Sequence, residues 1–439
     1  MIADFGIEMM TLIIFASLFI FLALGVPVGF ALGSITILFT LFFWGPQGLG
    51  NIPLVVHNQM SPTLLAIPLF LLMANVLERS GIADALYEAI YRWTGGIPGG
   101  LAIGTVLICA VYGAMSGVSG AATVSMGIVA IPSMRKRNYS KHLAAGAVAA
   151  GGVLGIVIPP SVIMILYASI VQVSVGGMFF GGIIPGVMIA IMHGVFIFIR
   201  CLRNPDLGPA VPVEERFSFA EKVESLRHLV LPGILIFVVL YSIYAGITTP
   251  TEAAAVGAVG AFICAAFHKR LTIKMFQEAT RRTLGLSVMI MWIVFGASMF
   301  NALYISIGGR AFVVNILAGL DLSPWLIVIG MQVVLLILGM IMDDYAVVML
   351  AAPIFSPVVV ALGFDPIWFG VLFILNMQMA YLTPPYGFNL FYLKGVVQKD
   401  ISMGDLYRAV VPFLLVQLIG LILVMLFPFL ITWLPSLIL

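Results

Sequence analysis

Two groups of residues in this 439-residue chain could bind a cation. The first is the run 113–123, which is rich in small and hydroxyl residues and contains Ser116 and Ser119. The second is the acidic pair Asp343 and Asp344, which lies between two apolar runs. Hard cations such as sodium take oxygen ligands, which hydroxyls, carboxylates and backbone carbonyls supply. An ionisable residue inside a membrane segment is also functional by default.

Each group accompanies an apolar segment that is interrupted by two consecutive prolines, Pro159-Pro160 and Pro384-Pro385. Proline removes a backbone donor and disfavours helix in the residue before it, so each break leaves unpaired carbonyls and helix ends. Lipid cannot satisfy these groups, so the breaks must face protein or a water-filled cavity. A matched pair of broken segments in two halves of a chain points to a transporter's binding site.

Simpler interpretations of these residues remain open. The run 113–123 could serve close helix packing of the GxxxG kind. Asp343 and Asp344 could cap the following helix, and this role is compatible with a functional one. We interpret Glu252, two residues after Pro250, as a helix-start acid.

The composition indicates a polytopic, all-α membrane protein. Hydrophobic residues make up 62%, charged residues only 9%, and the mean hydropathy is +1.19. Water-soluble globular proteins have about 25% charged residues. The apolar runs are continuous over about 17 to 25 residues, which is the length of a membrane-spanning helix.

We expect ten crossings and two re-entrant helical hairpins. The hairpins are the apolar stretches 98–134 and 324–362, whose middles are small or polar. The broken spans are 142–171 and 366–396. The other predicted spans are 9–24, 26–44, 53–78, 178–201, 228–246, 250–268, 284–307 and 410–433.

This layout puts 19 of the 20 lysines and arginines in inner loops, with Arg310 as the exception. It also divides the chain into two repeats, 1–201 and 228–439, joined by a cytoplasmic linker, 202–227. Each repeat has a short amphipathic helix (82–93 and 310–320), then a hairpin, then a broken span. The two repeats have opposite orientations, so they form an inverted repeat.

Other classes of function find little support. Cys109, Cys201 and Cys264 have no metal-ligand spacing and are predicted to be packing residues. The chain has no phosphate-binding Gly-rich loop with Lys-Ser/Thr, and topology explains its basic residues without nucleic acid. We therefore expect no enzyme activity and no cofactor. A membrane-embedded enzyme would have to use Asp343 and Asp344 as its catalytic acids.

Several motifs together resemble the large, DctM-like membrane subunit of TRAP transporters, the tripartite ATP-independent periplasmic systems. The motifs are Ser116-Gly-Val-Ser-Gly120, Ile158-Pro-Pro-Ser161, Gly246-Ile-Thr-Thr-Pro-Thr-Glu252, Ala352-Pro-Ile-Phe-Ser-Pro357 and Leu382-Thr-Pro-Pro-Tyr-Gly387. The resemblance covers nearly the whole chain. It implies an elevator mechanism, in which hairpins and broken helices move as a transport domain against a scaffold.

The resemblance also implies site residues, with Na⁺ as the only metal. The first sodium site would use Ser116, Ser119, Gly155, Ile158 and Pro160. The second would use Gly339, Met342, Thr383 and Pro385. Asp343, Ser161 and Asn389 would lie at the substrate cavity.

The function implied is Na⁺-coupled uptake of a small organic acid, such as a C4-dicarboxylate or sugar acid, across a bacterial or archaeal inner membrane. The implied partners are a periplasmic substrate-binding protein (DctP-like) and a small four-helix membrane subunit (DctQ-like). The alternative is a stand-alone Na⁺- or H⁺-coupled dicarboxylate or citrate carrier of the same superfamily.

Overall fold

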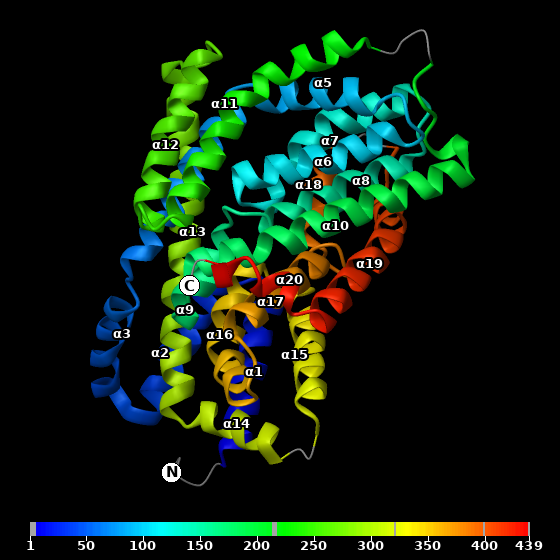
Figure 1. The fold of residues 1–439 in the computed structure, drawn as a ribbon. Helices are drawn as coiled ribbons and strands as arrows, with labels where there is room; N and C mark the ends of the chain where they lie inside the picture. The colour runs from blue at the N-terminus through cyan, green and yellow to red at the C-terminus, as the bar shows by residue number, and fades with distance from the viewer. Residues whose placement is uncertain (1–5, 213–216, 320–321, 398–399, 438–439) are drawn as a thin grey trace.

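The computed structural model describes residues 6–212, 217–319, 322–397 and 400–437, and within these ranges it contains helices and no strands (Figure 1). The first ten α-helices are α1 Ile7–Ala23, α2 Val28–Gly48, α3 Ile52–Asn58, α4 Ala66–Arg79, α5 Ile82–Thr94, α6 Gly100–Ser116, α7 Ser119–Lys136, α8 Lys141–Gly152, α9 Val162–Val171 and α10 Val175–Arg203. The next ten are α11 Phe219–Tyr244, α12 Pro250–Phe267, α13 Ile273–Ser306, α14 Gly309–Gly319, α15 Pro324–Gly339, α16 Asp344–Ala361, α17 Pro366–Ala380, α18 Phe388–Lys394, α19 Met403–Leu426 and α20 Phe429–Thr432. Arg216, Lys399 and Leu320, which carry parts of the topology predictions, lie outside the described residues.

Many of these helices begin where a side chain replaces the missing backbone partners. Glu252 forms a capping box with Thr249 at the start of α12, which confirms its predicted role. Asp343 caps α16, because its carboxylate accepts from the N–H of Ala346 at 3.0 Å. Its predicted capping role is also confirmed. Ser174, Ser218, Thr272, Ser323, Asp365 and Ser402 cap six further helices in the same way.

Among the described residues, seven helical segments are long and apolar enough to cross a membrane. They are Val28–Asn58, Pro62–Arg79, Val175–Arg203, Pro250–Phe267, Ile273–Ser306, Asp344–Ala361 and Met403–Leu426, and a bent pair within α11 would be an eighth. The other predicted crossings coincide with shorter apolar helices: α1, the pair α8 and α9, and α17. Since α16 passes this test although it lies in a predicted hairpin, length alone does not separate a hairpin arm from a crossing.

The predicted span 53–78 is wrong as a single helix. α3 ends at Asn58, and a new helical segment starts after Ser61, whose hydroxyl accepts from the N–H of Thr63 at 3.3 Å. This stretch is apolar except for His57, Asn58 and Gln59, where α3 ends, and Ser61-Pro62, where the next helical segment starts.

We call α2, α4, α12 and α13 the scaffold group, after the role that the resemblance predicts for them. Within it, α4 packs against α12 and α13, and α13 packs against α2. The last pair crosses closely, because a Cβ added at Gly296 would lie 2.1 Å from the carbonyl oxygen of Gly29. The short helices α5 and α14 lie at opposite ends of the molecule (Figure 1).

In the hairpin group, α8 packs against α6, α7 and α19, while α16 packs against α9 and α17 against α15. The ranges 98–134 and 324–362 therefore each hold two helices joined by a short turn. The ranges 142–171 and 366–396 each hold two helices separated by a Pro-Pro segment, and both Pro-Pro bonds are cis. The two groups meet where α4 contacts α6 and α9 and where α13 contacts α16.

Candidate functional site

The first hairpin turns sharply between α6 and α7. Gly117 adopts a left-handed conformation (φ +64°), and its N–H donates to the carbonyl of Gly113 at 2.7 Å. Glycine suits this position because a Cβ there would be strained and would lie 2.7 Å from the carbonyl oxygen of Pro160. The turn therefore ends directly against the first Pro-Pro break.

The contact between this turn and the break depends on glycines on both sides. A Cβ added at Gly113 would lie 2.4 Å from the Cα of Gly155, and one added at Gly155 would lie 2.8 Å from the Cα of Gly113. The two backbones thus touch. The small residues of the run 113–123 do serve close packing, as the simpler interpretation holds, and this packing also brings the hydroxyls to the break.

The residues of the predicted first sodium site lie close together at this contact, and their binding of sodium stays a prediction. Ser116 and Ser119 are buried and line one cavity. The Ser116 hydroxyl donates to the carbonyl of Val118 at 3.1 Å. Within the described chain, the Ser119 hydroxyl and the carbonyls of Ile158 and Pro160 take part in no hydrogen bond. These oxygens are free to coordinate a cation.

The second hairpin turn meets the second break in the same way. A Cβ added at Gly339 would lie 2.7 Å from the Cβ of Ala380, at the end of α17. Met342 is buried, and its N–H donates to the carbonyl of Leu338 at 2.8 Å. The Thr383 hydroxyl donates to the carbonyl of Met379 at 2.8 Å.

The second predicted sodium site offers fewer free oxygens than the first. The carbonyl of Pro385 already accepts from the Tyr407 hydroxyl at 2.7 Å. The Thr383 hydroxyl keeps lone pairs for a cation, since it acts only as a donor in its hydrogen bond. A cation here would have to share or displace the Tyr407 interaction.

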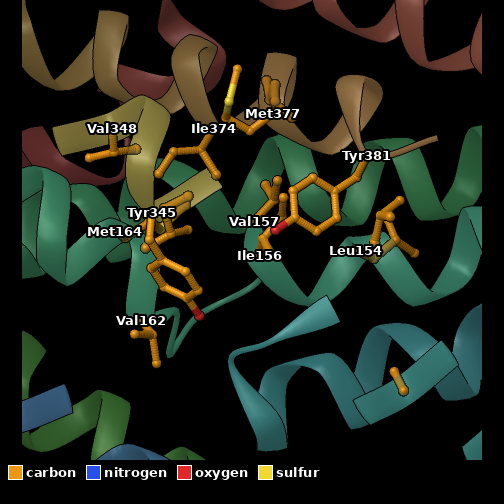
Figure 2. Close-up of a cluster of buried hydrophobic side chains, with 14 of the residues drawn as sticks. Leu154, Ile156, Val157, Val162, Met164, Tyr345, Val348, Ile374, Met377 and Tyr381 are labelled. Atoms are coloured by element: carbon orange, nitrogen blue, oxygen red, sulfur yellow. The ribbon is translucent and has the colours of Figure 1, made fainter. Parts of the chain in front are cut away.

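The two breaks pack against each other through an apolar cluster (Figure 2). Leu154, Ile156 and Val157 come from the first break, and Met377 and Tyr381 come from the second. Tyr345 and Val348 of α16 complete the cluster. The two halves therefore share one core. The first break is buried at Pro159 and Pro160, whereas Pro385 and Tyr386 of the second break are exposed.

A cavity of about 170 Å³ lies between the two groups of helices. We call its two sides the scaffold wall, from α4 and α13, and the hairpin wall. The hairpin wall is Ser116, Val118, Ser119, Gly120, Ala121, Val124, Asp344, Tyr345, Tyr381 and Tyr392. The scaffold wall is Leu71, Ala74, Asn75, Glu78, Arg282, Leu286, Met289 and Ile290. The cavity thus combines apolar surface with hydroxyls and three ionisable side chains.

The charged groups of this cavity are held in place by hydrogen bonds. Arg282 donates to the Glu78 carboxylate at 2.7 Å. Asp344, which is 2% exposed, accepts from the Tyr381 hydroxyl at 2.7 Å. The guanidinium and the Asp344 carboxylate lie on different walls, so the cavity could bind a small molecule that carries both charge and polar groups.

Asp343, Ser161 and Asn389, which are predicted at the substrate cavity, are not among the residues that line this cavity, and their role in substrate binding stays a prediction. Asp343 caps α16 and is absent from the lining. Ser161 is fully buried and donates to the carbonyl of Ile156 at 2.6 Å. Asn389 is fully buried, accepts from the Thr123 hydroxyl at 2.6 Å and donates to the carbonyl of Ala149 at 2.9 Å. These three side chains form hydrogen bonds with backbone groups and, for Asn389, with the buried Thr123 hydroxyl.

Sequence reasoning missed the scaffold wall. The predicted topology counts Arg282 among the inner-loop basic residues and assigns no role to Glu78, the last residue of the predicted span 53–78. The sequence did contain a sign of this wall. Glu78 and Arg79 are adjacent, Glu278 and Arg282 are four residues apart on a helix, and each pair has one acid and one base that could form an ion pair with the other. In the structure they bond crosswise, Glu78 to Arg282 at 2.7 Å and Arg79 to Glu278 at 3.7 Å.

Comparison with known proteins decides the family. Residues 15–430 match the family described as Tripartite ATP-independent periplasmic transporter, DctM component. The chain belongs to this DctM family. A C4-dicarboxylate TRAP transporter large permease protein from Vibrio cholerae is 32% identical, over 94% of this chain and 94% of its own length. A sialic acid TRAP transporter large permease protein from the same organism is 30% identical, over 94% and 95%.

The fold has solved counterparts. The YdaH transporter of Alcanivorax borkumensis superposes with a TM-score of 0.62 at 17% identity, covering 88% of this chain and 90% of that one. The DctM family match confirms the resemblance drawn from the sequence motifs. The chain is thus a large permease subunit of a TRAP transporter and a multi-pass membrane protein.

Proposed function

We propose that this chain carries a small organic acid inward together with sodium ions, by an elevator movement of the hairpin group against the scaffold group. The observation that carries this proposal is the cavity where the first hairpin turn, Asp344 and Tyr381 meet α4 and α13. A cavity divided between two groups of helices can change its access when one group moves against the other.

The oxygen-rich first turn supports sodium as the coupling ion. The Ser119 hydroxyl and the unpaired carbonyls of Ile158 and Pro160 offer hard ligands beside the cavity. One sodium ion entering along 100 mV releases about 2.3 kcal/mol, so two ions supply nearly 5 kcal/mol before any concentration gradient is counted. With two ions a monoanion enters with net positive charge, so the membrane potential helps its uptake. With a dianion at least three ions are needed for the potential to help.

Several features favour the inverted-repeat division at 1–201, 202–227 and 228–439. The matching short helices α5 and α14 lie at opposite ends (Figure 1). Each is followed by a helical hairpin and then by a broken helix. This order with reversed direction is what an inverted repeat requires.

The cavity's position favours an inward-facing state. Its lining on α4 lies next to Arg79, and its lining on α13 lies next to Arg281. Basic residues mark the cytoplasmic side under the positive-inside rule. The substrate would leave between α4, α13 and the hairpin wall.

We further propose that a periplasmic binding protein of the DctP type delivers the acid and that a small four-helix DctQ-type subunit completes the membrane complex in the inner membrane. The test is uptake of a panel of radiolabelled organic acids into proteoliposomes. Four preparations are compared: the chain with or without the small subunit, each with or without the binding protein, under an imposed sodium gradient.

Uptake that requires sodium and both partners is the expected result. Uptake with sodium alone would favour the stand-alone carrier instead. If no acid enters under any condition while the complex remains folded, the transport proposal is wrong.

A further inference from the structure

We propose that Asp344 selects substrates with a hydrogen-bond donor, a hydroxyl or an ammonium group, at the end of the molecule away from the carboxylate, while Arg282 binds the carboxylate. This inference rests on the proposed transport function of the cavity. It narrows the substrate class from organic acids in general to hydroxy acids and amino acids, and it disfavours simple dicarboxylates.

The first argument is the unequal use of the two oxygens of Asp344. Oδ1 accepts from the Tyr381 hydroxyl at 2.7 Å and from the N–H of Tyr345 at 3.0 Å. Oδ2 has no hydrogen-bond partner in the described part of the chain, although the residue is 2% exposed and lines the cavity. Oδ2 therefore faces the cavity without a donor from the described chain, so a ligand that supplies a donor is stabilised here.

The orientation of this carboxylate is fixed from the second break. Tyr381 ends α17, where its N–H donates to the carbonyl of Met377 at 3.0 Å. Its own carbonyl accepts from the N–H of Asn389 at 3.2 Å, across the Pro-Pro segment. The Tyr381 hydroxyl therefore holds Oδ1 from a rigid position, which leaves Oδ2 for the cavity.

The second argument is the opposite wall. Arg282 uses one N–H for Glu78 and is 40% exposed, so most of its donors are free for a carboxylate. Leu286, Met289 and Ile290 add apolar surface to the same wall of the cavity. A small molecule with a carboxylate, an apolar part and a hydrogen-bond donor matches this set of surfaces.

The third argument is the charge balance of the lining. Glu78 and Arg282 neutralise each other, and Asp344 adds one acidic group. A second carboxylate placed against Asp344 would meet a like charge in a poorly solvated site, which is strongly unfavourable. A hydroxyl or ammonium group at the same place would be attracted.

The experiment measures ligand binding to the purified complex of this chain with its small subunit, in sodium and without the binding protein. Omitting the binding protein keeps that protein's own selectivity out of the result. The probes share one carbon skeleton: succinate, 4-hydroxybutyrate, 4-aminobutyrate and butyrate, with the corresponding three- and five-carbon sets. The readout is the concentration that gives half-maximal thermal stabilisation.

In the native chain we expect a hydroxy or amino acid to bind at least tenfold more tightly than the dicarboxylate of equal length. Asp344→Asn should reduce this ratio at least tenfold, because an amide can also donate to a carboxylate. Asp343→Asn is the matched control, since it removes the same charge one residue away and outside the cavity; it should leave the ratio unchanged. Tyr381→Phe keeps the Asp344 charge but removes the hydroxyl that orients it, and it should reduce the ratio severalfold. This second variant tests the inference even if Asp344→Asn does not fold.

A native preference for dicarboxylates, an equal affinity for all probes, or an unchanged ratio in Asp344→Asn would overturn the inference. So would the absence of any stabilisation when the proteoliposome assay shows uptake of an acid. The absence of both binding and uptake would instead overturn the proposed function, and the inference with it.

Discussion

At the scale of single residues, the first hairpin turn is distinguished by oxygen atoms without partners. Ser119 is 2% exposed, and its hydroxyl makes no hydrogen bond within the described chain. Ser125, on the same helix, instead lies 3.4 Å from the Tyr112 hydroxyl and outside the cavity lining. Two serines of one helix thus differ in whether their oxygen is available to a cation.

We predict that Ser119→Ala raises the sodium concentration for half-maximal uptake at least fivefold, because one ligand is lost. Ser125→Ala is the control and should leave the sodium activation curve in place. The measurement is initial uptake in proteoliposomes at varied external sodium. An activation curve for Ser119→Ala that coincides with the native one would remove Ser119 from the site.

At the scale of elements, the hairpin turn and the broken helix are held together by glycine contacts rather than by large side chains. Gly155 touches Gly113 through their Cα positions, and Gly117 lies against the carbonyl of Pro160. Backbone at membrane depth must stay close to other protein, since lipid supplies no hydrogen bonds. The close approach therefore serves both packing and the proposed ion site.

We predict that Gly155→Ala reduces uptake at least tenfold and destabilises the protein by roughly 1 to 3 kcal/mol, because the added methyl group overpacks this contact. Gly233→Ala in α11 is the control, since nothing lies within 4 Å of a Cβ added there. It should be neutral or slightly stabilising. Uptake rate and thermal unfolding are measured for both. Native uptake by Gly155→Ala would show that the turn and the break need not touch during transport.

At the scale of the whole molecule, the scaffold group meets the hairpin group where α4 contacts α6 and α9 and where α13 contacts α16. One of these contacts is the hydrogen bond from the Asn301 amide on α13 to the carbonyl of Met349 on α16, at 2.8 Å. The native cysteines Cys109, Cys201 and Cys264 are free and buried, as their predicted packing role requires. A cysteine-free background is therefore needed for cross-linking between the groups.

We predict that the pair Asn301→Cys and Met349→Cys, when oxidised, abolishes uptake because α13 can no longer move past α16. Reduction should restore uptake to at least half, and each single variant should be insensitive to oxidant. The extent of cross-linking is followed by the mobility of a fragment after cleavage between the two sites. Full uptake by the cross-linked protein would contradict an elevator movement between these helices.

Features that depend on near neighbours in the chain could be predicted from the sequence. The Pro-Pro breaks, the capping roles of Glu252 and Asp343, and the helical pairs within 98–134 and 324–362 follow from local proline, glycine and cap chemistry. The joined span 53–78 failed for the same local reason, because its polar Ser-Pro junction was outweighed by overall hydropathy.

The sequence by itself therefore determined the membrane class, the broken helices and the DctM family. Only the tertiary structure decided which side chains share the cavity. Arg282 meets Glu78 across about 200 positions of chain, and Ser119 lines the same cavity as Asp344. Contacts between residues so far apart in the chain depend on the angles at which helices pack. The hydropathy of the sequence does not predict these angles. For this reason the sequence could not show that Ser161 and Asn389, beside the breaks, are buried and hydrogen-bonded to backbone carbonyls. Nor could it show that Asp344 lines the cavity.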